Sequence, residues 1–145
     1  MIAIQTIGTG NRQLIETGMP AVPMFFARAG EQASRRVLEF FTAQIRNRNT
    51  RVAYGRAVAR FAAWCESRGV AIEQLEPMIV ARYIEELSHE VMTPSVKQHL
   101  AAIRMLFDWL VIGQIVPFNP AASVRGPRYV VKKGKTPGNR SRATS

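Results

Sequence analysis

Apolar side chains recur every three or four residues along most of the chain, with polar side chains between them. This spacing places the apolar positions on one side of an α-helix. It predicts four helices with the approximate bounds 30–45, 50–68, 77–90 and 94–112. No segment shows an alternating strand pattern of comparable strength. The sequence therefore predicts an all-α fold in which four helices pack as an orthogonal bundle.

Each predicted helix carries a set of apolar residues that we expect in the core. The sets are Val37, Phe40, Phe41 and Ile45, then Tyr54, Val58, Phe61, Ala62 and Cys65, then Ile79, Val80, Tyr83, Ile84 and Leu87, and finally Val96, Leu100, Ile103, Phe107 and Leu110. Thr50 and Thr93 are expected as N-caps because a hydroxyl accepts hydrogen bonds from the first free N–H groups of a helix. Gly69 and Gly113 are expected to end the second and fourth helices.

The composition divides the chain into three regions. Residues 1–23 have no helical period and are expected to form a flexible N-terminal arm. Residues 24–123 contain the helices and are expected to form one domain. Residues 124–145 contain seven Lys and Arg residues, no acidic residue and many Pro, Gly, Ser and Thr residues. This composition predicts a flexible basic tail.

The charge favours a polyanionic partner. The chain has 20 Lys and Arg residues against 10 Asp and Glu residues, a formal net charge of +10, and nucleic acid is the commonest polyanion. The charges are also segregated, because five arginines and no acid lie between residues 40 and 65, whereas five glutamates lie in and around the third helix. A protein with one basic and one acidic side approaches DNA in one orientation.

The exposed face of the fourth helix carries candidate DNA contacts. Lys97 and Arg104 fall opposite its buried positions and can contact phosphate, and Gln98 can pair with an adenine edge. On the second helix, Arg51 and Arg56 lie off the buried stripe. An ordinary solvated face would look similar, since half of any amphipathic helix is polar, and this alternative stays open.

Motifs for other chemistry are missing from the sequence. It contains no phosphate-binding glycine loop, no dinucleotide-binding turn and no paired Cys or Cys/His spacing for a metal. We therefore expect no cofactor, no metal and no small-molecule substrate. The single cysteine, Cys65, cannot form an internal disulfide, which fits a reducing cytoplasm. Neither a signal peptide nor an apolar stretch of transmembrane length is present, so no membrane partner is expected.

An ordered series of motifs, covering about two thirds of the chain, resembles the N-terminal DNA-clamping domain of the tyrosine recombinases, the phage integrase family. The family's second helix is resembled by Thr50, Arg51, Tyr54 and Phe61 together with residues 62–65. Residues 95–100 look like the start of its fourth helix, and residues 119–121 look like the turn after that helix. Residues 128–137 look like its interdomain linker.

The resemblance implies a SAM-like helical bundle whose second and fourth helices cross the major groove of double-stranded DNA. It also implies a linker that wraps the duplex, and other recombinase protomers as partners on DNA. The residues expected to contact DNA are Arg51, Arg56, Ser95, Lys97, Gln98, Arg104, Arg128, Lys132 and Lys133.

The catalytic features of the family do not accompany this domain. The family cleaves DNA with a tyrosine nucleophile, assisted by arginines, a lysine and a His-x-x-Arg box. Neither His89 nor His99 is followed by Arg three residues later. Tyr54 and Tyr83 fall on buried stripes, and Tyr129 lies in the tail without partner residues. We therefore expect no enzymatic activity from this chain.

Three hypotheses follow. In the first, the chain is the DNA-binding domain of an integrase-like recombinase that acts in DNA integration and recombination. The residues after 137 no longer resemble the family, and we interpret them as a truncated or frameshifted end. In the second, the catalytic half lies on another part of the gene. In the third, the chain is a helical protein–protein interaction module that does not bind DNA.

Overall fold

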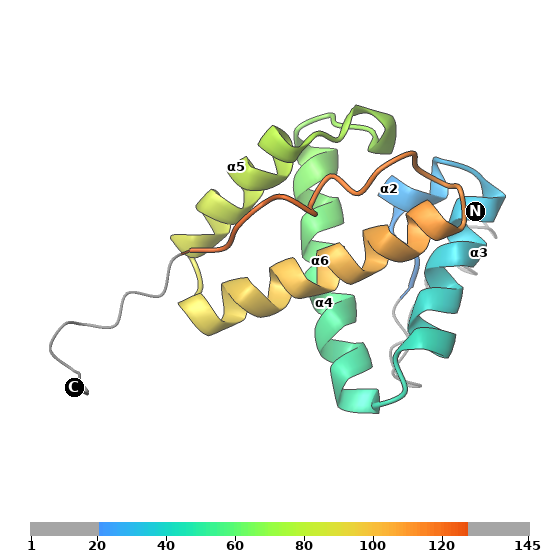
Figure 1. Ribbon diagram of the computed structural model, residues 1–145, viewed down its shortest axis with the longest axis horizontal. Coiled ribbons are helices and arrows are strands. Elements are labelled where there is room, and N and C mark those ends of the chain that lie inside the picture. The colour runs from blue at the N-terminus through green and yellow to red at the C-terminus, as the bar shows by residue number, and fades with distance from the viewer. Residues whose placement is uncertain (1–20, 128–145) are drawn as a thin grey trace, which may run out of the picture.

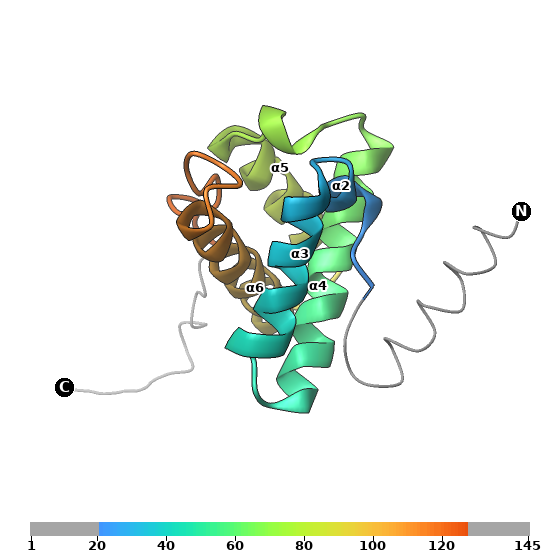
Figure 2. The ribbon, with the colours of Figure 1, turned by 90° about the vertical axis from the view of Figure 1, so that its right-hand side faces the viewer.

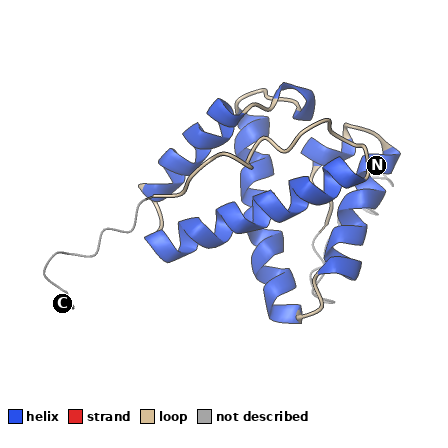
Figure 3. Cartoon of the chain, in the orientation of Figure 1, coloured by secondary structure: helices blue, strands red, loops and turns tan. Residues whose placement is uncertain are grey.

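Helices dominate the computed structural model, which describes residues 21–127 (Figures 1 and 3). With the labels of Figure 1, the order is α2 (Met24–Ala27), α3 (Glu31–Glu39), the π-helical turn η1 (Phe40–Gln44), α4 (Arg48–Ser67), the 3₁₀ turn η2 (Ile72–Gln74), α5 (Pro77–Ser88) and α6 (Thr93–Ile112). No strand occurs within the described residues, and the all-α prediction is confirmed.

The four predicted helices are present as α3 with η1, α4, α5 and α6. The sequence analysis missed α2. A helix of 4 residues is too short to show a periodic pattern. Its two aromatic residues, Phe25 and Phe26, are both buried.

Both expected N-caps were wrong, each by a turn or less. The α4 helix begins before Thr50, since the side chain of Asn47 is the cap and accepts a hydrogen bond from the Thr50 backbone N–H at 3.0 Å. Thr93 is the first residue of α6, and Met92 takes the N-cap position. Asparagine is as strong a cap as any residue, which suits Asn47 to this position.

The two expected helix ends differ in conformation. Gly69 follows α4 with a φ of +70°, the left-handed region that glycine tolerates best. Gly113 is the C-cap of α6, but its φ is −82°, and the next residue, Gln114, takes the left-handed conformation with a φ of 62°. The φ angle of Gly113 is therefore one that other residues also adopt, and it does not by itself require glycine.

The core forms where α6 crosses α4 at a steep angle (Figure 1), with α3 running roughly antiparallel to α4 (Figures 1 and 2). Phe61 of α4 lies at the centre and is fully buried. Its ring centroid lies 6.2 Å from that of Phe25, 5.0 Å from that of Tyr83 and 6.4 Å from that of Phe107. One side chain thus joins α2, α4, α5 and α6. The predicted core residues are buried, apart from Tyr54 and Ile79, which are half-buried.

A reciprocal contact between Arg36 and Trp109 fastens α3 to α6. The Trp109 indole N–H donates to the Arg36 carbonyl at 2.9 Å, and Arg36 Nε donates to the Trp109 carbonyl at 3.1 Å. The Arg36 guanidinium also lies over the Trp109 ring, 3.6 Å from its centroid. This arrangement explains Gly113, because a Cβ there would lie 2.8 Å from Arg36 Cδ and closer still to its Nε.

After α6 the chain doubles back along that helix (orange to red in Figure 1). We call residues 114–127 the return segment. The Asn119 side-chain amide donates to the Arg104 carbonyl at 3.0 Å and to an Asp108 carboxylate oxygen at 2.7 Å. Ala121 and Val124 are buried against the bundle. Residues 124–127, assigned to a tail by composition, therefore lie against α6 in the structure.

The remaining predictions on the chain ends lie outside the described residues. They are the arm over residues 1–20, the tail from residue 128, and the three candidate DNA contacts Arg128, Lys132 and Lys133. The boundaries placed at 23 and 123 stay predictions.

Gly113→Ala is expected to destabilise the fold, because the added methyl group displaces Arg36 from Trp109. Overpacking of this kind costs roughly 1–3 kcal/mol, which urea denaturation followed by circular dichroism measures. Gly126→Ala is the matched control, since its Cβ would meet the nearest atom, Leu100 Cδ2, at an ordinary 3.6 Å. Equal stability of the two variants would contradict the close approach at Gly113.

Candidate nucleic-acid interface

The arginines of α4 fall into two groups with different surroundings. In the C-terminal half of the helix, Arg60 pairs with Glu90, and Arg68 pairs with Glu86 at 2.7 Å. The Trp64 indole N–H also donates to Glu86, at 2.9 Å. This hydrogen bond, with the positive charge of Arg68, lowers the pKa of Glu86. Glu86 of α5 and Glu90, just after that helix, thus offset the positive charges in the C-terminal half of α4.

The N-terminal half of α4 has no acidic residue within it. Arg56 is exposed there. Arg51 is half-buried, and its guanidinium donates to the Phe41 carbonyl at 2.8 Å and to the Ile45 carbonyl at 3.0 Å. The structure gives Arg51 the role of capping the end of η1. Its contact with DNA stays a prediction.

The N-terminal half of α6 presents the next candidates. Ser95, Lys97 and Gln98 are exposed, and α6 contains no acidic residue before Asp108. Arg104 is half-buried. Its Nε donates to the Ala121 carbonyl at 3.2 Å and one terminal nitrogen donates to the Val124 carbonyl, so it holds the return segment on the helix. Contact between Arg104 and DNA also stays a prediction.

Arg60 lies one turn after Arg56 on α4. Burial, with the charge of Arg60, lowers the pKa of His99, the neighbour of Gln98 on α6. We call the exposed side chains of Arg56, Ser95, Lys97 and Gln98 the basic surface. These four predicted side chains are exposed, one on α4 and three in the first half of α6. Arg51 lies at the start of α4, and Arg104 lies under the return segment.

Arg125 was missed as a site residue by the sequence analysis. It is exposed and lines a hollow of about 390 Å³ with Lys97 and Arg104. Its positive charge was noted, but it was counted with a flexible tail. No sequence signal places it beside α6, because that position depends on contacts between residues about 20 positions apart.

Comparison with known proteins identifies the family. The family model of the phage integrase N-terminal SAM-like domain matches residues 38–113. The chain belongs to this family. It is also 30% identical over 82 residues to the tyrosine recombinase XerD of Chlorobaculum tepidum, a stretch that covers 55% of this chain and 27% of that relative. No solved structure matches the chain. The family resemblance and the SAM-like bundle are confirmed.

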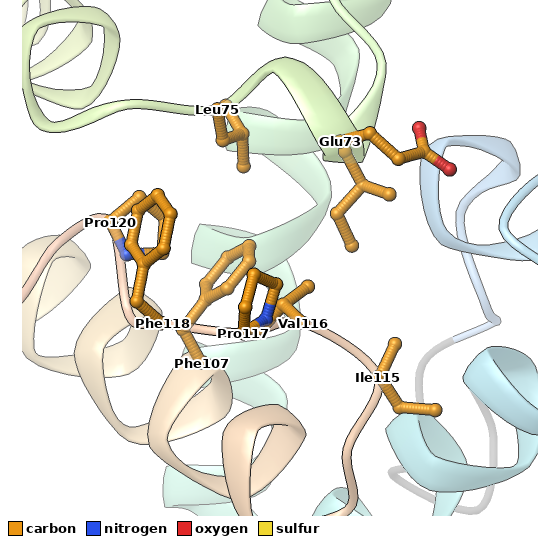
Figure 4. A pocket seen from close by; sticks show the side chains of 9 residues that line it. Glu73, Leu75, Phe107, Ile115, Val116, Pro117, Phe118 and Pro120 are labelled. Atoms are coloured by element: carbon orange, nitrogen blue, oxygen red, sulfur yellow. The ribbon is translucent and has the colours of Figure 1, made fainter.

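The integrase domain also has an apolar hollow of about 230 Å³ between η2 and the return segment (Figure 4). Leu75, Phe107, Val116 and Phe118 point into it, and Glu73 is its one ionisable lining residue. A single carboxylate provides no acid–base pair. Within residues 21–127, no three His, Cys, Asp or Glu side chains gather as a metal site would require.

The tyrosines and the cysteine of the integrase domain sit mainly in its core. Tyr83 is buried, and burial raises the pKa of its hydroxyl. Tyr54 is half-buried, and Tyr129 lies outside the described residues. Burial also raises the pKa of the Cys65 thiol to about 12, so this side chain is a neutral core residue. Among the described helices, none has the length and apolar composition needed to cross a membrane.

His99 is expected to make the stability of the domain depend on pH. Burial, with the nearby charge of Arg60, lowers its pKa below the usual 6.5. The unfolded chain therefore binds the proton more readily, so stability is complete above pH 6.5 and falls as the pH drops toward the folded-state pKa. Urea denaturation at pH 7.5 and about pH 5.5 measures this loss.

The matched control is the exposed His89. His99→Gln is expected to reduce the loss of stability between the two pH values, and His89→Gln is expected to leave it unchanged. An equal loss in wild type and in His99→Gln would show that another group carries the pH dependence.

Proposed function

We propose that this domain binds double-stranded DNA through its basic surface, as the non-catalytic clamp of an integrase-like recombinase acting in DNA integration and recombination. The observation that supports this most is the distribution of charge. Glu86 of α5 and Glu90, just after that helix, pair with Arg68 and Arg60 in the C-terminal half of α4. Arg56 in the other half of α4, and Lys97 and Gln98 of α6, are exposed.

The side chains of the basic surface suit different parts of a duplex. Arg56 and Lys97 contact phosphates, Gln98 reads a base edge in the major groove, and Ser95 donates a hydroxyl at the start of α6. Arg51 and Arg104 act mainly by holding η1 and the return segment in position. The proposed phosphate contacts also include Arg128, Lys132 and Lys133, which lie outside the described residues. Each phosphate contact releases condensed cations, which makes the affinity strongly salt-dependent.

Strand cleavage is assigned to no residue of this chain. The sequence contains no His-x-x-Arg box, and Tyr83 is buried in the core. The chain spans 27% of the length of the XerD relative. Its proposed partners are therefore DNA and other recombinase protomers bound to the same DNA, and no cofactor takes part.

The alternative is a protein–protein interaction module. Six exposed large apolar side chains among the described residues favour it, and the three most exposed are Met92 at 78%, Met78 at 74% and Ile112 at 71%. Scattered exposed apolar residues are common on soluble proteins, so charge distribution carries more weight. The alternative predicts DNA binding that is weak and insensitive to salt.

Salt dependence tests the DNA-binding proposal. Fluorescence anisotropy with a random duplex of about 30 base pairs is expected to give a slope of log K against log salt of about −4 or steeper, at about −0.9 per phosphate contact. Arg56→Ala is expected to weaken binding to all duplexes and to make the slope less steep by about 0.9. Arg82→Ala, an exposed arginine on acidic α5, removes the same charge as a control. No binding at low salt would contradict the proposal.

Gln98→Ala is expected to change sequence preference more than affinity. A side-chain amide that pairs with adenine discriminates between bases by about 1–3 kcal/mol, whereas nonspecific affinity comes from phosphate contacts. Selection from a randomised duplex library is expected to give a motif for wild type that loses information at one position in the variant. An unchanged motif would remove Gln98 from base reading.

A further inference from the structure

The return segment places a third cation beside two cations of α6. Lys97 and Arg104 are seven residues apart, or about two helical turns, and so lie on the same edge of α6. Arg125 approaches this edge from the return segment, which runs from the C-terminal end of α6 toward its N-terminal end (Figure 1). The hollow between them measures about 390 Å³.

Every ionisable residue that lines this hollow carries a positive charge. Leu100, Gly126 and Pro127 complete it, and no acid lines it. Gly126 lies close to α6, since a Cβ on it would be 3.6 Å from Leu100 and 3.9 Å from Lys97. The return segment therefore lies close to α6 where Arg125 and Lys97 line the same hollow.

Arg104 is held in a fixed position at this site. Its bonds to the Ala121 and Val124 carbonyls engage Nε and one terminal nitrogen. A guanidinium has five N–H donors, so these two bonds leave donors for a further acceptor. A side chain that is already ordered loses less conformational entropy when it binds a ligand. Arg104 thus lines the hollow while its hydrogen bonds hold the return segment on α6.

We propose that Lys97, Arg104 and Arg125, which we call the phosphate cradle, together bind one phosphate of the DNA backbone between α6 and the return segment. This inference rests on the proposed DNA binding and adds the place where the backbone crosses α6. Gln98 is rotated by about 100° from Lys97 around the helix axis. A duplex whose phosphate binds in the cradle therefore passes along the Lys97 edge of α6. Its bases then face the side of α6 that carries Gln98.

Arg125→Ala tests the cradle directly. Arg125 is exposed and outside the core, so the thermal unfolding temperature is expected to match that of wild type. In the anisotropy titration, the variant is expected to bind random duplex more weakly and to reduce the steepness of the salt slope by at most about 0.9, the contribution of one phosphate. Arg82→Ala is the matched control for loss of one exposed charge. Its slope is expected to equal that of wild type.

The double variant Lys97→Gln with Arg125→Ala shows whether the two cations share a phosphate. Residues that bind one group are not additive, so the double variant is expected to lose no more than about 0.9 of the slope in total, the contribution of one phosphate. A loss of about 1.8 would mean two separate phosphates and would overturn the cradle.

Failure of the cradle and failure of the proposed function give different results. If wild type binds with a steep salt slope while Arg125→Ala behaves like Arg82→Ala, the cradle is wrong and DNA binding stands. If wild type does not bind at low salt, both proposals are wrong.

Discussion

The packing of α6 across α4 around Phe61 is the contact on which the rest of the structure depends. Three ring centroids from three other helices lie within 6.4 Å of this ring. Removing such a buried aromatic side chain costs about 3–5 kcal/mol, a large part of the stability of a domain of this size. The crossing also fixes which sides of α4 and α6 remain exposed. The basic surface exists because the core orients these two helices.

Arginine serves two purposes in this domain. Three half-buried arginines donate to backbone carbonyls: Arg36 of α3, Arg51 of α4 and Arg104 of α6. Each fastens an irregular or terminal segment to a helix, because the guanidinium has enough donors to satisfy carbonyls that helix ends leave free. Arg56 and Arg125 are exposed and have no such role among the described contacts. Net charge alone does not separate the two groups.

The spacing of apolar residues predicted most of the fold, and particular residues show which features that spacing did not predict. The buried positions of α4 and α6 follow from apolar residues every three or four positions, a local property of the helix. The short helix α2 has no such period. Arg51 and Arg104 look like surface residues on a helical projection, and their carbonyl partners lie in segments with no regular pattern. Arg125 looks like part of a tail for the same reason.

The sequence by itself determined the positions of the long helices, their buried faces, the excess of positive charge and the family, because each of these depends on local spacing or composition. Tertiary structure decided which cations are engaged and which are exposed. The contact between Arg36 and Trp109 joins residues 73 positions apart, and the contacts of Arg104 with the return segment join residues 17 and 20 positions apart. Such contacts form only when the core has set the helices in place, so no local pattern in the sequence contains them.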